Sequence, residues 1–354
     1  MEQKYRVIGL MSGTSLDGVD LAHCVFHLAD GRWSFEIKEA ETVSYSDSWK
    51  SRLASLPSKS AMEFVAADRE YGDYLGQLVK KFISNNHLQV DFVSSHGHTI
   101  FHQPEKRITS QIGSGAALAA ACGLPVVCDF RSLDVALGGQ GAPLVPVGDR
   151  LLFSDYDYCL NLGGIANISF EKNSERIAFD ICPANMPLNA LAQMEGQAYD
   201  KDGALARKGY IHETLLNNLN SLDYYSLAYP KSLGREWVED KFFPLLNTNS
   251  LSIADRLCTC CEHIAIQIAN VIKSNGDTGK LYITGGGAFN KFLVERISEH
   301  LSSQIMLPEA KLVNYKEALI FAFLGVLRWR GENNCLKSVT GASKDSCSGA
   351  VYSC

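Results

Sequence analysis

The chain has 354 residues, 46% of them hydrophobic and 20% charged, which is enough apolar material for a sizeable core and enough length for two domains. The formal net charge is −6 and no run of Lys or Arg exceeds two residues, so nucleic acid is disfavoured as a partner because its phosphates need a basic face. The longest apolar run, residues 318–327, is about half the length that spans a membrane, and the first residues lack the apolar stretch of a secretory signal.

The first half of the chain is expected to open with a small β-sheet and to continue with alternating helices and strands. The expected strands are residues 5–10, 19–28, 33–43, 92–95 and 125–128, and the expected helices are residues 61–85 and 113–122. Glycine and proline crowd residues 133–147. We interpret this stretch as a linker or functional loop, with the crossing into a second domain near it.

Beyond that loop the pattern restarts. Strands are expected at residues 158–162, 165–170, 177–181 and 281–284, and helices at residues 186–195, 252–274, 290–301 and 316–329. Each half opens with a strand, a glycine-containing turn and a second strand. This repetition predicts a duplicated α/β fold.

Eleven cysteines, an odd number, are scattered along the chain, with one cluster at Cys258, Cys260 and Cys261. A secreted protein would be expected to carry an even disulfide framework. The pattern therefore favours reduced thiols and a cytoplasmic protein. The clustered cysteines fall in an expected helix without sharing one face, so we interpret them as core or surface thiols rather than zinc ligands.

The first turn, residues 9–20, has the features of an anion-binding loop. Gly13 and Gly18 allow a tight turn, successive N–H groups in such a turn form an anion nest, and Ser12, Thr14 and Ser15 add hydroxyl groups. A plain polar hairpin is the alternative interpretation.

Two further glycine turns lie in the second half. The segment from Asn161 to Asn167 holds Gly163 and Gly164, and it is either a second phosphate-facing hairpin or a structural turn. Gly285, Gly286 and Gly287 follow a strand and precede a helix, so a flat ligand such as adenosine is expected to lie against that backbone. The dinucleotide fingerprint G-x-G-x-x-G is not completed there, which disfavours a dehydrogenase.

Two sets of titratable residues complete the candidate site. Asp180 ends an expected strand, where a carboxylate aimed into a cleft suits a general base; capping of the next helix is the alternative. His96, His98 and His102 lie within seven residues. A metal site is one interpretation of them, but no carboxylate or cysteine lies at a fitting local spacing, so substrate contacts or packing are favoured.

Taken in order along nearly the whole chain, these strings resemble the anhydro-N-acetylmuramic acid kinase family. The strings that carry the resemblance are residues 11–20, 95–100, 111–113, 129–131, 134–146, 161–169, 231–236, 285–290, 317–318 and 340–342. The resemblance implies an actin/hexokinase-like (ribonuclease H-like) fold, with mixed sheets flanked by helices in two domains around a central cleft. We expect the first domain at residues 1–131 plus about 331–354 and the second at residues 132–330.

The resemblance also implies a function. The family uses ATP and water to open 1,6-anhydro-N-acetylmuramic acid and to phosphorylate its O6, giving N-acetylmuramic acid 6-phosphate in the recycling of cell-wall peptidoglycan. Asp180 matches the catalytic aspartate. The positions that would bind ATP are Ser12, Gly13, Thr14, Ser15, Leu16, Asp17, Gly18, Val19, Asp20, Asn161, Gly163, Gly164, Asn167, Gly285, Gly286 and Gly287, and those that would bind the sugar are His96, Thr99, Arg131 and Asn185. Mg²⁺ is expected with ATP, without a protein metal site assigned, and a homodimer is expected.

The sequence departs from the family pattern near the expected sugar site. The usual Thr-Gly-Pro-Gly-Asn after the aspartate reads Ile181-Cys182-Pro183-Ala184-Asn185, and the usual His-Gly-Gln-Thr has His98 in place of Gln. Side chains at Cys182 and Ala184 are expected to restrict the loop and narrow the cleft. Two alternatives therefore stay open, a kinase of the same fold that acts on a different sugar and a nucleotide-binding relative without catalysis.

Overall fold

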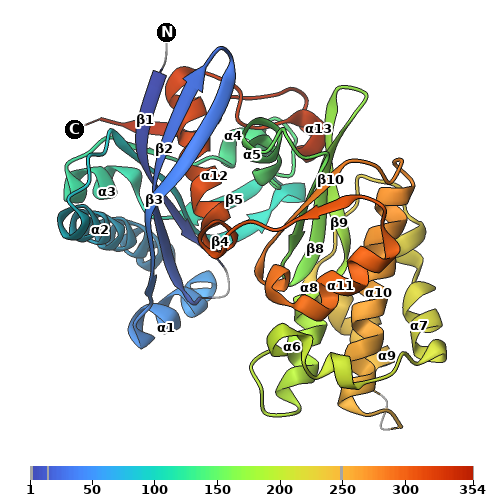
Figure 1. Cartoon of the computed structure of the whole chain (residues 1–354). Coiled ribbons are helices and arrows are strands. Elements are labelled where there is room, and N and C mark those ends of the chain that lie inside the picture. The colour runs from blue at the N-terminus through green and yellow to red at the C-terminus, as the bar shows by residue number, and fades with distance from the viewer. Residues whose placement is uncertain (1–2, 14–15, 248–249, 354) are drawn as a thin grey trace. The chain divides into compact units, whose positions relative to one another are not determined.

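The computed structural model describes residues 3–13, 16–247 and 250–353. The chain forms two compact units (Figure 1). Unit 1 comprises residues 1–152 and 315–354, and unit 2 comprises residues 153–314. Thr14 and Ser15, two of the expected phosphate-binding residues, lie outside the described residues.

Unit 1 is built on a 7-stranded sheet in the order β12-β6-β4-β1-β2-β3, in which β5 pairs with β4. Its strands are β1 (Gln3–Ser12), β2 (Gly18–Ala29), β3 (Arg32–Ser44), β4 (Phe92–Gln103), β5 (Ile108–Ile112), β6 (Val126–Cys128) and β12 (Ala350–Tyr352). Its helices are α1 (Asp47–Ser55), α2 (Ala61–Asn86), α3 (Gly115–Cys122), α4 (Ser132–Ala136), α5 (Val145–Leu152), α13 (Lys337–Thr340) and most of α12 (Ala310–Arg330).

Helices cover both faces of this sheet because successive strand residues point to opposite sides. On one face, Ile8 and Leu10 of β1 share a buried cluster with Tyr71 and Leu75 of α2. On the other face, the Phe26 ring of β2 lies 5.4 Å from that of Phe323 in α12. Helix α2 starts with a capping box between Ser60 and Glu63, which satisfies two otherwise unpaired N–H groups.

Unit 2 is built on a 5-stranded sheet in the order β11-β10-β7-β8-β9. Its strands are β7 (Tyr158–Leu162), β8 (Ile165–Lys172), β9 (Glu175–Pro183), β10 (Lys280–Thr284) and β11 (Gln304–Met306). Its helices are α6 (Asn185–Gln193), α7 (Glu213–Asn220), α8 (Arg235–Trp237), α9 (Phe243–Leu246), α10 (Ile253–Lys273) and α11 (Lys291–His300). The buried face of α10, including Leu257, Ile264 and Ile268, forms one core with the strands.

The two sheets share one topology. In each, the first three strands form an antiparallel meander. Two later strands then add in parallel on the other side of the first strand, β4 and β6 in unit 1 and β10 and β11 in unit 2. The duplicated α/β fold with mixed sheets that the sequence predicts is therefore confirmed.

The unit boundaries differ from those expected near residues 131 and 331, because α5 and α12 pack with the first sheet. The Ser94 hydroxyl of β4 donates to the carbonyl oxygen of Phe321 in α12 at 2.5 Å. The Lys316 ammonium lies 2.8 Å from the Asp149 carboxylate of α5, and both side chains are more than nine-tenths buried. These buried polar contacts place residues 132–152 and 315–330 in unit 1.

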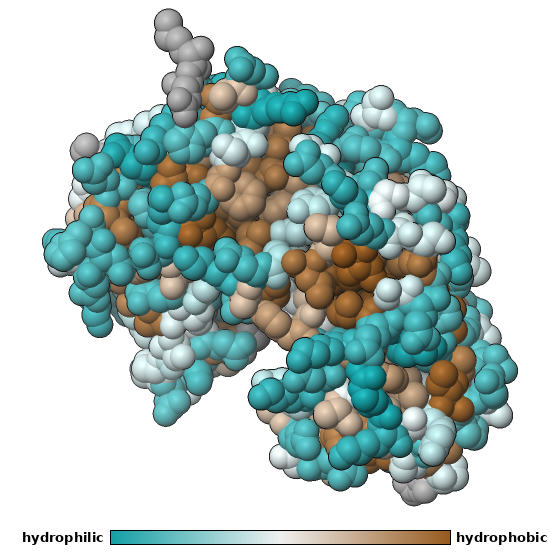
Figure 2. Space-filling model, viewed as in Figure 1, coloured by the Kyte–Doolittle hydropathy of each residue, from teal (hydrophilic) through white to brown (hydrophobic). Residues whose placement is uncertain are grey.

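Other features match the sequence expectations in part. Residues 133–147 are not a plain linker, since they include α4 and the start of α5. Cys258, Cys260 and Cys261 are buried on α10 as free thiols, in agreement with the interpretation as core thiols. Among the described residues, no helix combines the length and the apolar character that a membrane span requires. Hydrophilic residues predominate on the face shown in Figure 2.

Replacing Asp149 with Asn should destabilise the protein by about 3 kcal/mol or more, because a buried ammonium loses its carboxylate. Chemical denaturation measures this loss. The double substitution Asp149→Leu with Lys316→Met should lose less than the single one, since no unpaired charge stays buried. Equal stability of Asp149→Asn and wild type would contradict the structural role of the pair.

Candidate functional site

Buried polar side chains form hydrogen bonds with Ser12, where the turn after β1 begins. The Ser12 hydroxyl lies 2.6 Å from the Tyr45 hydroxyl and 2.8 Å from Nδ1 of His98. The Leu16 backbone has φ 60°, and its N–H donates to the carbonyl oxygen of Gly13 at 3.4 Å. Val19 points into the core, so only its backbone can face a ligand. Ser12, at the carboxyl end of a central strand, is thus anchored where this turn begins.

Carboxylates gather near this turn. Asp20, opposite Met11 in the hairpin, accepts a hydrogen bond from Thr42 at 2.6 Å. Burial raises the pKa of Asp20, and the charge of Asp17 raises it further. Desolvation raises the pKa of Glu317, at the start of the unit 1 part of α12; the charge of Arg131 offsets part of this rise and the charge of Asp20 adds to it. Such mutual repulsion would be relieved by a bound cation.

His96 and Arg131 form one hydrogen-bonded pair. Nδ1 of His96 lies 2.9 Å from the Gly97 carbonyl oxygen and must donate to it, which leaves Nε2 to accept from the Arg131 guanidinium at 2.9 and 3.1 Å. Arg131 also donates to the Gly141 carbonyl oxygen at 2.6 Å. Burial lowers the pKa of His96 to about 3, so the imidazole is neutral at pH 7. Both of its ring nitrogens are engaged within the protein.

Strand β4 continues through a bulge beyond Ser95, the expected end of this strand. Leu10 pairs with Ser95 but Ser12 pairs with His98, so β4 carries one extra residue. Gly97 has φ 73°, and a Cβ there would lie 2.5 Å from the Ile112 carbonyl oxygen, which is why glycine is required. Thr99, one residue beyond His98, accepts a hydrogen bond from Gln111 at 3.3 Å. Among the described residues, no group of three or more acidic, histidine and cysteine side chains could hold a metal ion.

In unit 2, the expected glycine residues surround the end of β7. Asn161 pairs with Thr284 of β10 and with Asn167 of β8. Gly285 follows with φ 79°, and a Cβ there would lie 2.4 Å from Oδ1 of Asn161. Only glycine fits this position. The end of β7 therefore lies directly beside the turn that starts at Gly285.

Asn185 joins the two glycine turns of unit 2. Its side-chain amide donates to the Leu162 carbonyl oxygen at 2.8 Å, and its backbone N–H donates to that of Gly163 at 3.0 Å. A Cβ at Gly287 would lie 3.0 Å from the Asn185 side-chain oxygen, so the third glycine also leaves room for this residue. Three of the expected site residues, Asn185, Gly163 and Gly287, thus lie in one cluster within this unit.

Asp180 lies on β9 opposite Asn167 of β8. Its Oδ2 accepts from the Leu233 N–H at 2.9 Å, whereas its Oδ1 has no hydrogen-bond partner among the described residues. Burial raises the pKa of this carboxyl group, and the Leu233 bond offsets part of the rise. The cap of α6 is Ala184, with no side-chain hydrogen bond, so the helix-capping interpretation of Asp180 is wrong.

Sequence reasoning missed the residues that hold Asp180. The Tyr224 hydroxyl donates to the Asp180 carbonyl oxygen at 2.6 Å. Lys231 donates to the Tyr224 carbonyl oxygen at 3.2 Å, and its ammonium lies 4.6 Å from the Tyr224 ring centroid. The string at residues 231–236, noted only as part of a resemblance, was the available signal. Its neighbour Leu233 acts through its backbone, which no pattern of side chains reveals.

The residues after Asp180 that differ from the family pattern do not point their side chains into the site. The register shift between Ala166 and Asn167 leaves Ile181 as an extra residue in β9. Ile181, Cys182 and Ala184 are 2%, 0% and 0% exposed and belong to the unit 2 core. The expectation that Cys182 and Ala184 narrow the cleft is therefore not supported, because their side chains fill the interior.

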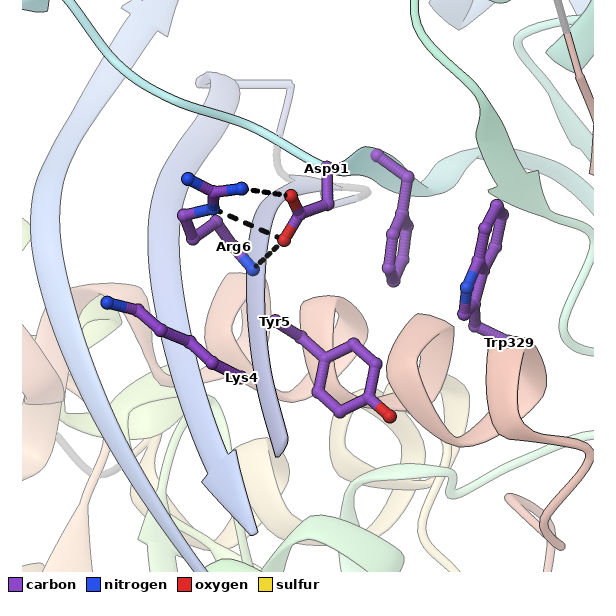
Figure 3. Close-up of a pocket in the computed structure, with 6 residues that line it drawn as sticks. Lys4, Tyr5, Arg6, Asp91 and Trp329 are labelled. Carbon is purple, nitrogen blue, oxygen red and sulfur yellow. Dashed lines mark hydrogen bonds and ion pairs between the residues drawn. The ribbon is translucent and has the colours of Figure 1, made fainter. Parts of the chain in front are cut away.

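A surface pocket of about 460 Å³ in unit 1 is separate from this set of residues. It is lined by Lys4, Tyr5, Arg6, Asp91, Phe92 and Trp329 (Figure 3). Tyr5 lies near the amino end of β1 and Ser12 at its carboxyl end, roughly 20 Å apart at the usual rise of a strand. The Arg6–Asp91 ion pair, at 2.6 Å, occupies its polar side.

A duplicated sheet with a glycine turn at the carboxyl end of each first strand defines the actin/hexokinase-like class of fold. The family model described as anhydro-N-acetylmuramic acid kinase matches residues 5–354. Proteins named anhydro-N-acetylmuramic acid kinase from Vibrio cholerae and Shewanella woodyi are 35% and 34% identical, over 99% and 98% of both chains. The chain belongs to the anhydro-N-acetylmuramic acid kinase family.

Solved structures are more distant. An activator of 2-hydroxyisocaproyl-CoA dehydratase from Clostridium difficile with bound ADPNP aligns with a TM-score of 0.44 at 13% identity, covering 92% of this chain and 97% of that one.

Replacing Tyr224 with Phe should lower the free energy of unfolding by about 1–2 kcal/mol, because the buried Asp180 carbonyl oxygen loses its donor. Urea denaturation measures the change. Tyr229→Phe is the matched control, since the Tyr229 ring stacks on Phe179 at 5.5 Å and its hydroxyl makes no hydrogen bond to the described residues. Equal effects of the two substitutions would refute a specific role for the Tyr224 hydroxyl.

Proposed function

We propose that this protein uses ATP and water to convert 1,6-anhydro-N-acetylmuramic acid into N-acetylmuramic acid 6-phosphate, as the names of its relatives suggest. The observation that carries the proposal is the Asp180 carboxyl group. One oxygen is fixed by the Leu233 N–H at 2.9 Å and the other has no partner among the described residues. A half-buried carboxylate with a raised pKa and one free oxygen suits a general base for water.

The ligand contacts follow from where each unit gathers its polar groups. In unit 1, the backbone of residues 12–20 would bind phosphate, and Arg131 and Thr99 would contact the sugar. His96 would hold the Arg131 guanidinium in place, since both of its ring nitrogens are already used. In unit 2, the segment from Asn161 to Asn167 would bind phosphate, Gly285 to Gly287 would lie against the nucleotide, and Asn185 would border the sugar.

The reaction requires one proton transfer and one phosphoryl transfer. Asp180 takes a proton from water while the water oxygen bonds to the anomeric carbon, and the bond between that carbon and O6 breaks. The freed O6 takes the γ-phosphoryl group as the bond to ADP breaks. Because phosphoryl transfer depends mainly on positioning and charge, the anchored turns contribute by holding the phosphates in line with O6.

Mg²⁺ is proposed as the partner of ATP. The fit rests on Asp20 and Glu317, whose pKa values are raised by desolvation and by neighbouring carboxylates. Mg²⁺ commonly binds one or two carboxylates together with substrate phosphates and water. The ion would neutralise phosphate charge. These two side chains would hold it.

Three finer points remain proposals. We place the protein in the cytoplasm, because every cysteine in the described part of the chain is a free thiol and an oxidising compartment would favour disulfides. A homodimer is proposed from the family resemblance. Among substrates, the buried positions of Cys182 and Ala184 favour the family's sugar over a different one.

Asp180→Asn should lower kcat by about 10²-fold or more, the usual loss of a general base. The amide oxygen can still accept from Leu233, so folding is preserved. ADP release with Mg-ATP, measured with and without the anhydro-sugar, tests this together with detection of the 6-phosphosugar. Because the Asp180 pKa is raised, kcat/KM of the wild type should fall with decreasing pH at values above the ordinary aspartate pKa of about 3.9.

The outcomes of that assay separate the candidate functions. ADP release stimulated only by another sugar would favour the alternative substrate. Nucleotide binding without any sugar-stimulated turnover would favour a non-catalytic relative. Full activity of Asp180→Asn would remove the base role.

Restoring the usual glycines with Cys182→Gly and Ala184→Gly should cost about 1–3 kcal/mol of stability, since buried atoms are deleted and backbone freedom increases. KM for the sugar should change little, because neither side chain faces the site. Denaturation and steady-state kinetics on the same preparation compare the two effects. A large change in KM with unchanged stability would show that these positions select the substrate.

A further inference from the structure

A chain of hydrogen bonds runs beneath the first turn of unit 1. It links Tyr71 of α2, Tyr45 after β3, Ser12 at the end of β1 and His98 of β4. The Tyr45 hydroxyl contacts that of Tyr71 and lies 2.6 Å from Ser12 Oγ, which lies 2.8 Å from Nδ1 of His98. Ser12, Tyr45 and His98 are 4%, 4% and 3% exposed and Tyr71 is 0% exposed. These groups are sealed from solvent, so their protons must be satisfied within the protein.

The direction of the chain follows from counting donors. Burial raises the pKa of Tyr71 and of Tyr45, so both phenols keep their protons. Within the described residues, the Tyr71 hydroxyl contacts only the other hydroxyl groups of this hydrogen-bond network. Donation from Tyr71 to Tyr45 gives every buried proton of this network an acceptor, whereas a buried donor left unpaired costs its full desolvation, so we take this direction.

The remaining protons are then fixed in turn. Tyr45 has one proton, which it gives to Ser12 Oγ. Ser12 in turn gives its proton to Nδ1 of His98, which must be unprotonated, with the ring hydrogen on Nε2. Burial lowers the pKa of His98 to about 4, in keeping with a neutral ring at pH 7.

We propose that His98 is a positioning residue, which accepts the Ser12 proton and so fixes the phosphate-binding turn after β1. The proposal rests on the function proposed above and adds the roles of two residues. The Ser12 hydroxyl donates its only proton to His98 and accepts a hydrogen bond from Tyr45. It therefore presents no hydroxyl donor to a phosphate oxygen.

The position of His98 depends on the bulge at Gly97. Without the extra residue in β4, Gly97 would lie opposite Ser12, and the His98 ring would point to the other face of the sheet. A glutamine at position 98, the residue usual in the family, could accept or donate through its amide. A neutral imidazole with its hydrogen on Nε2 can only accept at Nδ1, so in this tautomer His98 fixes the direction of its hydrogen bond with Ser12.

The first test is spectroscopic and needs no turnover. With ¹⁵N-labelled histidine, long-range proton–nitrogen correlation spectra distinguish the two neutral tautomers and the charged ring, and the His98→Asn variant assigns the signal among the nine histidines. We expect His98 to be neutral at pH 7 with hydrogen on Nε2. A proton on Nδ1, or a charged ring, would overturn the proposal even if the kinase function stands.

The second test is a double-mutant cycle on nucleotide affinity, measured by calorimetry with Mg-ATP and no sugar. Ser12→Ala and His98→Phe should each weaken binding by about tenfold, the worth of one hydrogen bond. The double variant should be no weaker than Ser12→Ala alone, because that variant already breaks the hydrogen bond between Ser12 and His98. His98→Asn, which can place an acceptor oxygen near the position of Nδ1, should recover most of the loss.

A control variant and two opposing results make this cycle decisive. His102→Phe replaces another histidine of β4, whose ring lies 3.1 Å from Thr109, and should leave affinity unchanged. A loss for Ser12→Ala but not for His98→Phe, or losses that multiply in the double variant, would mean that Ser12 contacts the phosphate directly. Wild-type protein that fails to bind ATP would sink the proposed function, while the tautomer experiment would still decide the hydrogen-bond direction.

Discussion

In each unit, the position of the first strand in the centre of the sheet determines which residues surround the turn at its carboxyl end. β1 and β7 each lie between an antiparallel partner and a parallel one, so the turn that follows has neighbours on both sides. In unit 1, β4 brings His98 opposite Ser12. In unit 2, β10 brings Thr284 opposite Asn161. Because the first strand is central, the glycine turn is reached by side chains from both neighbouring strands, and this convergence produces the candidate site.

Much of the architecture could be predicted from local pattern. The expected helix at residues 61–85 agrees with α2 at Ala61–Asn86, since its apolar periodicity and its Ser60 cap are encoded within the segment. The two opening hairpins also follow from local signals. The allocation of α12 could not be predicted, because it depends on contacts such as Ser94 with Phe321, which are far apart in the sequence.

The candidate site, too, could be predicted only in part, because its geometry depends on contacts between residues far apart in the sequence. The string at residues 95–100 carried part of the family resemblance, but the position of His98 opposite Ser12 depends on a bulge that only the sheet register reveals. Likewise, the composition of the segment after Asp180 suggested an altered pocket. The bulge at Ile181 instead turns consecutive side chains into the core. A substitution near an active residue changes the site only when its Cβ points there, and that direction is a property of the register.

The chain leaves unit 1 after Leu152 and returns to it at Tyr315, where α12 is interrupted by φ −116° and ψ 15°. Unit 2 is therefore continuous in sequence, whereas the sheet of unit 1 is completed only when β12 pairs with β6. During synthesis on the ribosome, domains fold as their residues emerge. The second unit to begin translation can thus reach its native state first, and the first must wait for the last residues of the chain before its sheet closes.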